Sequence, residues 1–265
     1  MTVTATHIGG PTLVLDLSGI RIVTDPTFDA PGPHPIGERV LHKLSPPALT
    51  AADLGAVDLV LLSHDQHPDN LDDSGRAFLS TVGQVLSTPA AAERIPGVRG
   101  LAPWEVVEIA TPQGALVVTA VPALHGPPGA EAFSGPVTGF VLRPPSGPTV
   151  YVSGDNASVT VVEQIADRFV DPRVGTGIDL AVLFCGAARR PDRPEQLTLT
   201  ADDAVLVAQA LGARRVVPVH AEGWLHFTES LGTVARAFAQ AGLGDRLTVL
   251  GAGVPTELLV AEVSA

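Results

Sequence analysis

The feature that most restricts the fold of this chain is a series of short apolar runs, each long enough for one β-strand and bounded by turn residues. The 27 Gly and 24 Pro residues among 265 favour many tight turns between short elements. We expect strands at Thr12–Asp16, Ile20–Thr24, Val57–Ser63, Val106–Ile109, Leu116–Val121, Gly139–Leu142, Thr149–Ser153, Leu180–Phe184, Arg215–Val219, Leu247–Leu250 and Glu257–Val260.

Helical periodicity appears between these runs. Thr200 is a suitable N-cap for one helix, and Gly212 is a suitable stop for it. Strands that come first in meanders and then alternate with helices predict an α/β fold, in which packed sheets carry helices on the outside. The expected helices, in which apolar residues recur at intervals of three and four, are Ser74–Thr81, Pro89–Arg94, Ser158–Phe169, Ala201–Leu211 and Thr228–Ala241.

The proline-rich segments Pro31–Pro35, Pro127–Pro128 and Pro191–Pro194 are expected to be loops. No internal repeat of fixed period is present, and no linker with a change of composition divides the chain. We therefore expect a single domain over residues 1–265.

Charge and hydropathy exclude several classes of function. The net charge of −12 argues against a nucleic-acid polymer as partner, because affinity for a phosphate backbone depends on Lys and Arg. No apolar run approaches the roughly 18–20 residues needed to cross a bilayer, and the N-terminus lacks the charged start of a secretory signal. We expect a cytoplasmic protein that acts on a small molecule and has no membrane partner.

The single cysteine, Cys185, excludes a disulfide within the chain and every Cys-rich zinc module. It follows an apolar run, so we expect a buried, unreactive thiol.

A dense group of potential metal ligands follows the expected strand Val57–Ser63. Imidazoles and carboxylates at the end of a strand can be turned toward one point, as a metal ion held by nitrogen and oxygen ligands requires. Taken alone, the segment could equally be an exposed polar loop with two incidental histidines. The group comprises His64, Asp65, His67, Asp69, Asn70 and Asp72.

Three further metal-competent residues follow other apolar strands. His125 comes after Leu116–Val121, Asp155 after Thr149–Ser153, and His220 after Arg215–Val219. If the strand ends converge, these side chains meet although they are far apart in the chain. This pattern favours a functional metal site over chance placement of eight histidines.

With these residues in place, the chain resembles the metallo-β-lactamase superfamily, in particular its branch of ascorbate-6-phosphate lactonases and related metal-dependent hydrolases. The resemblance covers nearly the whole chain. Its blocks are the opening THIGGPTLVLDLSGIRIVTDPTFD, the segment after Val57–Leu62, Pro-Ala-Leu-His-Gly around His125, Ser-Gly-Asp at 153–155, and the helix from Ala201 running into Pro218-Val219-His220. It implies a four-layer αβ/βα sandwich with a metal site at one edge of the two sheets.

The signature loop departs from the superfamily pattern H-x-H-x-D-H. His67 takes the second His position and Asp69 the Asp position, while Asn70 replaces the last His. The first position falls on Asp65, or on His64 if the loop carries an extra residue, and we prefer His64. The resemblance then implies a first metal on His64, His67 and His125, with Asp155 shared, and a second metal on Asp69, Asp155 and His220.

An amide oxygen is a weaker ligand than imidazole for zinc-like ions. We therefore expect one tightly bound divalent ion, Zn or Mn, and a second that is weak or absent. The expected function is a metal-dependent hydrolase that attacks an ester, lactone, amide or phosphoester with metal-activated hydroxide. Asp69, Asp155 and His220 are its expected catalytic residues: Asp69 ligates a second ion or takes the proton of the attacking water, and His220 binds a second ion or a substrate oxygen.

Other interpretations are open at this stage. A member of the fold that has lost its chemistry would be a ligand-binding or scaffold protein, and a phosphodiesterase acting on a small cyclic nucleotide is also compatible. Arg189, Arg190 and Arg193 either clamp a substrate phosphate or carboxylate or, as we favour, belong to a solvated loop or interface. His226 is either a substrate-pocket residue or, as we favour, a residue that caps a helix or packs. Because relatives of this branch often assemble, a homo-oligomer is possible.

Overall fold

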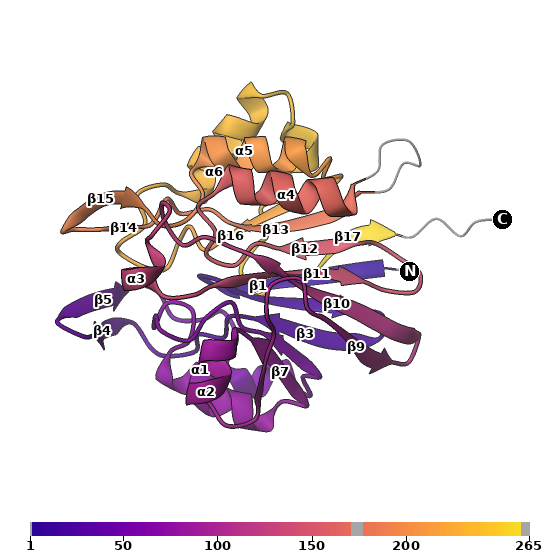
Figure 1. Cartoon of the computed structure of the whole chain (residues 1–265), viewed down its shortest axis with the longest axis horizontal. Coiled ribbons are helices and arrows are strands. Elements are labelled where there is room, and N and C mark those ends of the chain that lie inside the picture. The colour runs from indigo at the N-terminus through magenta and orange to yellow at the C-terminus, as the bar shows by residue number, and fades with distance from the viewer. Residues whose placement is uncertain (1, 171–176, 261–265) are drawn as a thin grey trace.

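The computed structural model describes residues 2–170 and 177–260. Within these residues two large mixed β-sheets pack face to face (Figure 1). The first sheet has seven strands in the order β17-β1-β2-β3-β6-β7-β8. Their bounds are β1 Thr2–Gly9, β2 Thr12–Leu17, β3 Ile20–Thr24, β6 Leu59–Leu61, β7 Gln84–Ser87, β8 Val98–Gly100 and β17 Thr256–Val260.

The second sheet has, in the described part of the chain, six strands in the order β16-β13-β12-β11-β10-β9. Two separate hairpins, β4–β5 and β14–β15, project on the same side of the molecule (Figure 1). The bounds are β9 Val106–Thr111, β10 Gly114–Pro122, β11 Thr138–Arg143, β12 Val150–Val152, β13 Leu180–Phe184 and β16 Arg215–Val219 for the sheet, and β4 Gly32–Ile36, β5 Arg39–Lys43, β14 Arg189–Arg190 and β15 Arg193–Gln196 for the hairpins.

Helices cover the outer faces of both sheets (Figure 1). Helices α4 (Val159–Phe169), α5 (Ala201–Ala210) and α6 (Leu231–Gln240) lie on the second sheet, whereas α1 (Asp73–Phe78) and α2 (Pro89–Arg94) lie on the first. The layers therefore run helix, sheet, sheet, helix, which confirms the predicted α/β sandwich. Shorter helices are α3 Glu131–Ser134 and the 3₁₀ turns η1 Ala51–Leu54, η2 Leu79–Thr81 and η3 Gly244–Arg246.

Burial on both faces of each sheet explains why the strands are continuous apolar runs. In β2, Leu13 and Leu15 point into the core between the sheets, while Val14 packs into the core beneath the helices of the first sheet. In β12, Val150 and Val152 face the inter-sheet core, and Tyr151 faces α4 and α5. Alternate side chains of a strand point to opposite faces, so every position of β12 and all but Asp16 of β2 are buried.

Strand direction brings the ends of several strands to one edge. β12 runs parallel to β13, which runs parallel to β16, and β6 runs parallel to both β3 and β7. β10 points the same way as β12, because each pairs antiparallel with β11 between them. The loops that follow β6, β10, β12 and β16 carry the candidate ligands, as the sequence predicted.

The expected elements Ile20–Thr24, Leu180–Phe184, Arg215–Val219 and Pro89–Arg94 match the structure residue for residue. The strand expected at Leu247–Leu250 is wrong, because Leu247 makes only an isolated bridge with Val216.

The strands β1, β7 and β8 of the first sheet were not predicted from the sequence. The loops expected at Pro31–Pro35 and Pro191–Pro194 were wrong in part: Gly32–Pro35 and Arg193–Pro194 belong to strands of the two hairpins, whereas Pro191 and Asp192 form a turn. Proline is tolerated there because a two-stranded hairpin leaves one side of each strand unpaired. None of the helices in the described part of the chain combines the length and apolar character that crossing a bilayer requires.

Candidate metal centre

Three imidazoles meet at the edge where β6 and β10 end. Nε2 of His64 lies 2.9 Å from Nδ1 of His67, and Nε2 of His125 lies 3.1 Å from the same atom. Oδ2 of Asp155 lies 3.6 Å from Nε2 of His125. Ligands at about 2.0–2.1 Å from a tetrahedral ion are roughly 3.3–3.4 Å apart, so these four side chains have the spacing of a coordination shell.

Hydrogen bonds on the far side of two rings fix which nitrogens carry lone pairs. Nδ1 of His125 lies 2.7 Å from the carbonyl oxygen of Leu197, which can only accept, so this nitrogen holds the hydrogen. The Ser63 hydroxyl donates to Oδ2 of Asp25 at 2.6 Å and accepts from Nδ1 of His64 at 2.9 Å. Nε2 of both His64 and His125 therefore presents a lone pair to the centre, as ligating histidines do.

Burial keeps these imidazoles neutral. It lowers the pKa of His67 to about 4 and that of His125 to about 3, and it lowers the pKa of His64 well below the ordinary value. Neutral imidazoles whose lone pairs converge in a buried space repel one another unless a cation lies between them. The donor set and its electrostatics thus fit a divalent metal ion.

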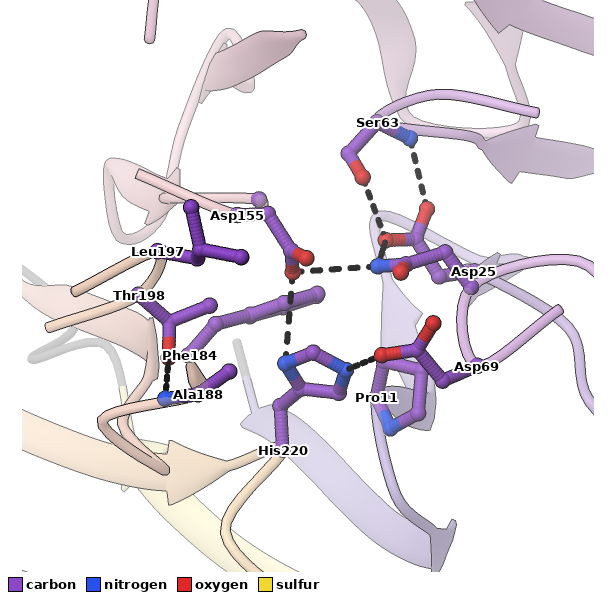
Figure 2. A network of polar contacts seen from close by, with 12 residues as sticks. Pro11, Asp25, Ser63, Asp69, Asp155, Phe184, Ala188, Leu197, Thr198 and His220 are labelled. Carbon is purple, nitrogen blue, oxygen red and sulfur yellow. Dashed lines mark hydrogen bonds and ion pairs between the residues drawn. The ribbon is translucent and has the colours of Figure 1, made fainter. Parts of the chain in front are cut away.

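A second group shares Asp155. Figure 2 shows the ring of His220 with one nitrogen toward Asp155 and the other toward Asp69. Nε2 of His220 lies 3.2 Å from Oδ2 of Asp69, and Nδ1 lies 3.2 Å from Oδ1 of Asp155. Oδ1 of Asp69 is buried and has no hydrogen-bond partner among the described residues. This group has oxygen and nitrogen donors for a second ion.

Backbone geometry holds His220 in position. Its φ of 57° lies in the left-handed region, which non-glycine residues seldom adopt. Its N–H donates to the carbonyl oxygen of Gly10 at 2.8 Å, which ties the end of β16 to the turn between β1 and β2. The strained conformation is thus held by the packing of the two sheets.

Asn70 presents hydrogen to the second group rather than a lone pair. Its amide nitrogen lies 3.0 Å from Oδ2 of Asp25 and 3.0 Å from Oδ1 of Asp155. The opposite orientation would place the amide oxygen against two carboxylates. The amide oxygen is buried without a hydrogen-bond partner among the described residues.

The carboxyl groups of the site differ in their protonation. Burial raises the pKa of Asp25 to about 7, although hydrogen bonds from Ser63 and Asn70 oppose this. Burial, together with the charges of Asp69 and Asp25, also raises the pKa of Asp155. Burial would raise the pKa of Asp69 too, but His226 and His220 hold it well below its usual range. Asp69 is therefore the ionised carboxylate of the site.

Comparison with known proteins identifies the family. A sequence model of the β-lactamase superfamily domain matches residues 20–221. The chain belongs to the metallo-β-lactamase superfamily. A curated relative from Pyrobaculum calidifontis, named UPF0173 metal-dependent hydrolase, is 27% identical over 217 residues, which cover 80% of this chain and 81% of the relative.

Two solved structures share the fold of this chain. Isothiocyanate hydrolase from Delia radicum gut bacteria superposes with a TM-score of 0.78 at 20% identity, covering 97% of this chain and 100% of that one. A possible metal-dependent hydrolase from Veillonella parvula gives 0.79 at 17% identity, covering 98% and 100%. The family match and its hydrolase relatives confirm the expected enzyme class, a metal-dependent hydrolase.

The neighbouring residues His64 and Asp65 point in different directions. The His64 ring faces the centre, whereas the Asp65 carboxylate is turned away and accepts from Arg94, with 2.9 Å between Nε and Oδ2. Asp72, another member of the ligand-rich segment, is also outside the centre. It pairs with Lys43 at 3.0 Å and caps α1 through the N–H of Gly75.

Two further side chains lie in the site. Asp25 contacts Ser63 and Asn70 and was not predicted as a site residue, although it lies within the opening block of the resemblance. His226 lies with Nε2 3.0 Å from Oδ2 of Asp69, so it belongs to the site and not to general packing. Neither contact leaves a periodic signal in the sequence. Cys185 is buried, as expected.

The centre opens into two adjoining cavities. A narrow one, of about 40 Å³, is lined by Asp69, His125, Asp155 and His226. A wider one, of about 880 Å³, shares His67 with it and lies between the two projecting hairpins and α3. A small molecule can therefore approach the three imidazoles.

Proposed function

We propose that this protein hydrolyses an ester, lactone, amide or phosphoester of a small molecule at one tightly bound divalent metal ion. The observation that carries this proposal is the convergence of ring nitrogens from His64, His67 and His125 beside Asp155. A bound divalent ion with an open position lowers the pKa of its water to about 7 and so supplies hydroxide at neutral pH.

The protein's own residues supply the remaining functions. Asp69 is ionised and is held by two imidazoles, with 3.2 Å to His220 and 3.0 Å to His226. A fixed carboxylate that lines the narrow cavity can orient the attacking water and accept its proton. Asp155 would contribute negative charge once a bound cation replaces its proton. His220 is buried, lines neither cavity and holds Asp69 and Asp155 in place through its two ring nitrogens.

The number of ions follows from Asn70. The amide of Asn70 donates a hydrogen bond to Oδ1 of Asp155. This oxygen is one of the atoms that a second ion would have to use as a ligand. We therefore propose that the group of Asp69, Asp155 and His220 binds a second ion weakly or not at all. Three imidazoles and a carboxylate suit Zn²⁺, and Mn²⁺ is the alternative.

The test combines metal analysis with activity. Protein purified without added metal, assayed on lactones, esters and phosphodiesters, should lose activity with a chelator and regain it with Zn²⁺ or Mn²⁺. His125→Ala should retain less than about a tenth of the bound metal, whereas His42→Ala, which alters an exposed histidine of β5, should retain all of it. A folded protein that binds no metal and hydrolyses nothing would instead be a ligand-binding or scaffold protein.

A further inference from the structure

One arginine lines both cavities. Arg39 begins β5 and sits beside the turn of the β4–β5 hairpin. It borders the wide cavity and the narrow one, and His67 borders both with it. A substrate that reaches the three imidazoles therefore passes this guanidinium.

The charge of Arg39 is not neutralised by a direct partner. The Arg39 guanidinium forms no hydrogen bond and no ion pair with any residue that the structure describes. The nearby Arg190 is paired with Asp192, at 2.6 Å between Nη2 and Oδ2. Burial and the positive charge of Arg190 lower the pKa of Arg39, while the charges of Asp192 and Asp69 act in the opposite sense. Arg39 and Arg190 line the same two cavities from different hairpins.

Two cation–π contacts hold part of the cavity lining in place without a ligand. The guanidinium of Arg190 lies 5.6 Å from the ring centre of Phe133, and that of Arg193 lies 4.4 Å from it. These contacts join the β14–β15 hairpin to α3 across the cavity from β5. Outside the proposed metal centre, the acidic residues Glu38, Glu131 and Asp192 line only the wide cavity, whereas Arg39 lines both. The narrow cavity also contains Asp69 and Asp155 of the centre itself.

The positive charge of Arg39 contrasts with the negative net charge of the chain. With a net charge of −12, the protein as a whole repels anions. An unpaired, half-buried guanidinium beside a reaction centre is costly unless a ligand anion pairs with it, and guanidinium groups bind carboxylates and phosphates through paired hydrogen bonds.

We propose that the site selects substrates that carry an anionic group, a carboxylate or a phosphate, which Arg39 binds while the bond to be cleaved lies at the three imidazoles. This inference rests on the proposed hydrolase function and specifies its substrate class. Arg39 is then a specificity residue, and Arg190 supports it from the opposite hairpin.

The test is a matched pair of esters with metal-loaded protein. One is the mono-4-nitrophenyl ester of glutarate, and the other is its neutral glutaramate counterpart. The wild type should prefer the charged ester by about tenfold or more in kcat/KM. Arg39→Gln should bring this preference toward 1 through the KM of the charged ester, and Arg39→Lys should restore part of it. Arg99→Gln, which removes the same charge from an exposed position of β8, should leave the preference unchanged.

Direct binding separates this inference from the proposed function. Calorimetric titration with glutarate and with inorganic phosphate should show binding to the wild type and about tenfold weaker binding to Arg39→Gln. The tighter of the two ligands identifies the anion. If neither ester is hydrolysed but this binding difference is seen, the anion site stands and the hydrolase proposal fails. Equal preference for both esters in the wild type, or equal anion binding by Arg39→Gln, overturns the inference.

Discussion

The amide nitrogen of Asn70 lies 3.0 Å from Oδ1 of Asp155 and donates a hydrogen bond to it. The same nitrogen also donates to Asp25, so one side chain links two buried carboxyl groups. A histidine at this position would offer a lone pair instead. Residue 70 therefore decides whether the second group of ligands gains one more metal-binding lone pair, from a histidine, or one more hydrogen-bonding N–H, from an asparagine.

Asn70→His should create a second metal site. We expect wild-type protein loaded with Zn²⁺ and passed through a desalting column to hold about one equivalent per chain, and the variant about two. Asn70→Ala is the matched control, because it removes the amide without adding a ligand and should stay at one equivalent. Two equivalents in the wild type would contradict the single-ion proposal.

Asn70→Ala should also lower stability. The substitution leaves two buried carboxyl groups each short of one hydrogen bond, at a cost of roughly 1–3 kcal/mol in the free energy of unfolding. Chemical denaturation of metal-free protein measures this difference. An unchanged midpoint would mean that water or another side chain replaces the amide.

Asp65 and His64 should respond differently to substitution. His64→Ala removes an imidazole from the centre and should lower metal content severalfold. Asp65→Asn should leave metal content unchanged and lower stability by only about 1 kcal/mol, because its partner Arg94 is largely solvent-exposed. Elemental analysis and thermal unfolding of both variants test this, and loss of metal from Asp65→Asn would place Asp65 in the coordination shell.

Metal retention should persist to low pH. Protons compete with a metal for imidazole nitrogen, so an exposed histidine site begins to lose its ion near pH 6.5. Here the pKa values of about 4 for His67 and about 3 for His125 mean that both rings are neutral above pH 5 and compete little with the ion. We expect full retention after dialysis at pH 5 and loss below about pH 4. Half-loss near pH 6.5 would show that the rings titrate normally.

Cys185 should be unreactive in the folded protein. Its thiol is buried, it donates to the carbonyl oxygen of Leu183, and burial raises its pKa far above the ordinary value. A thiol-reactive chromophore should detect about one cysteine per chain only after a denaturant is added. Rapid labelling of the native protein would indicate that α5 and α6 open readily.

The sequence by itself determined most strands of the two large sheets, the main helices and the residues able to bind metal. The run Leu180–Phe184 is apolar throughout because both of its faces are buried, and Thr200 caps α5 as expected. These signals are local, since they depend on neighbouring residues and on the two periodicities of helix and strand. The placement of His125, Asp155 and His220 after strands was visible for the same reason.

Only the tertiary structure decided which of these side chains meet. The contact between Asp69 and His220 joins residues 151 positions apart and depends on the order of strands in two separate sheets. The outward turn of Asp65, the donor role of Asn70, and the arrival of His226 and Arg39 at the cavity arise in the same way. The sequence pattern indicates which side chains are able to bind a metal. Strand pairing and packing determine the distances between those side chains, and so which of them meet at this site.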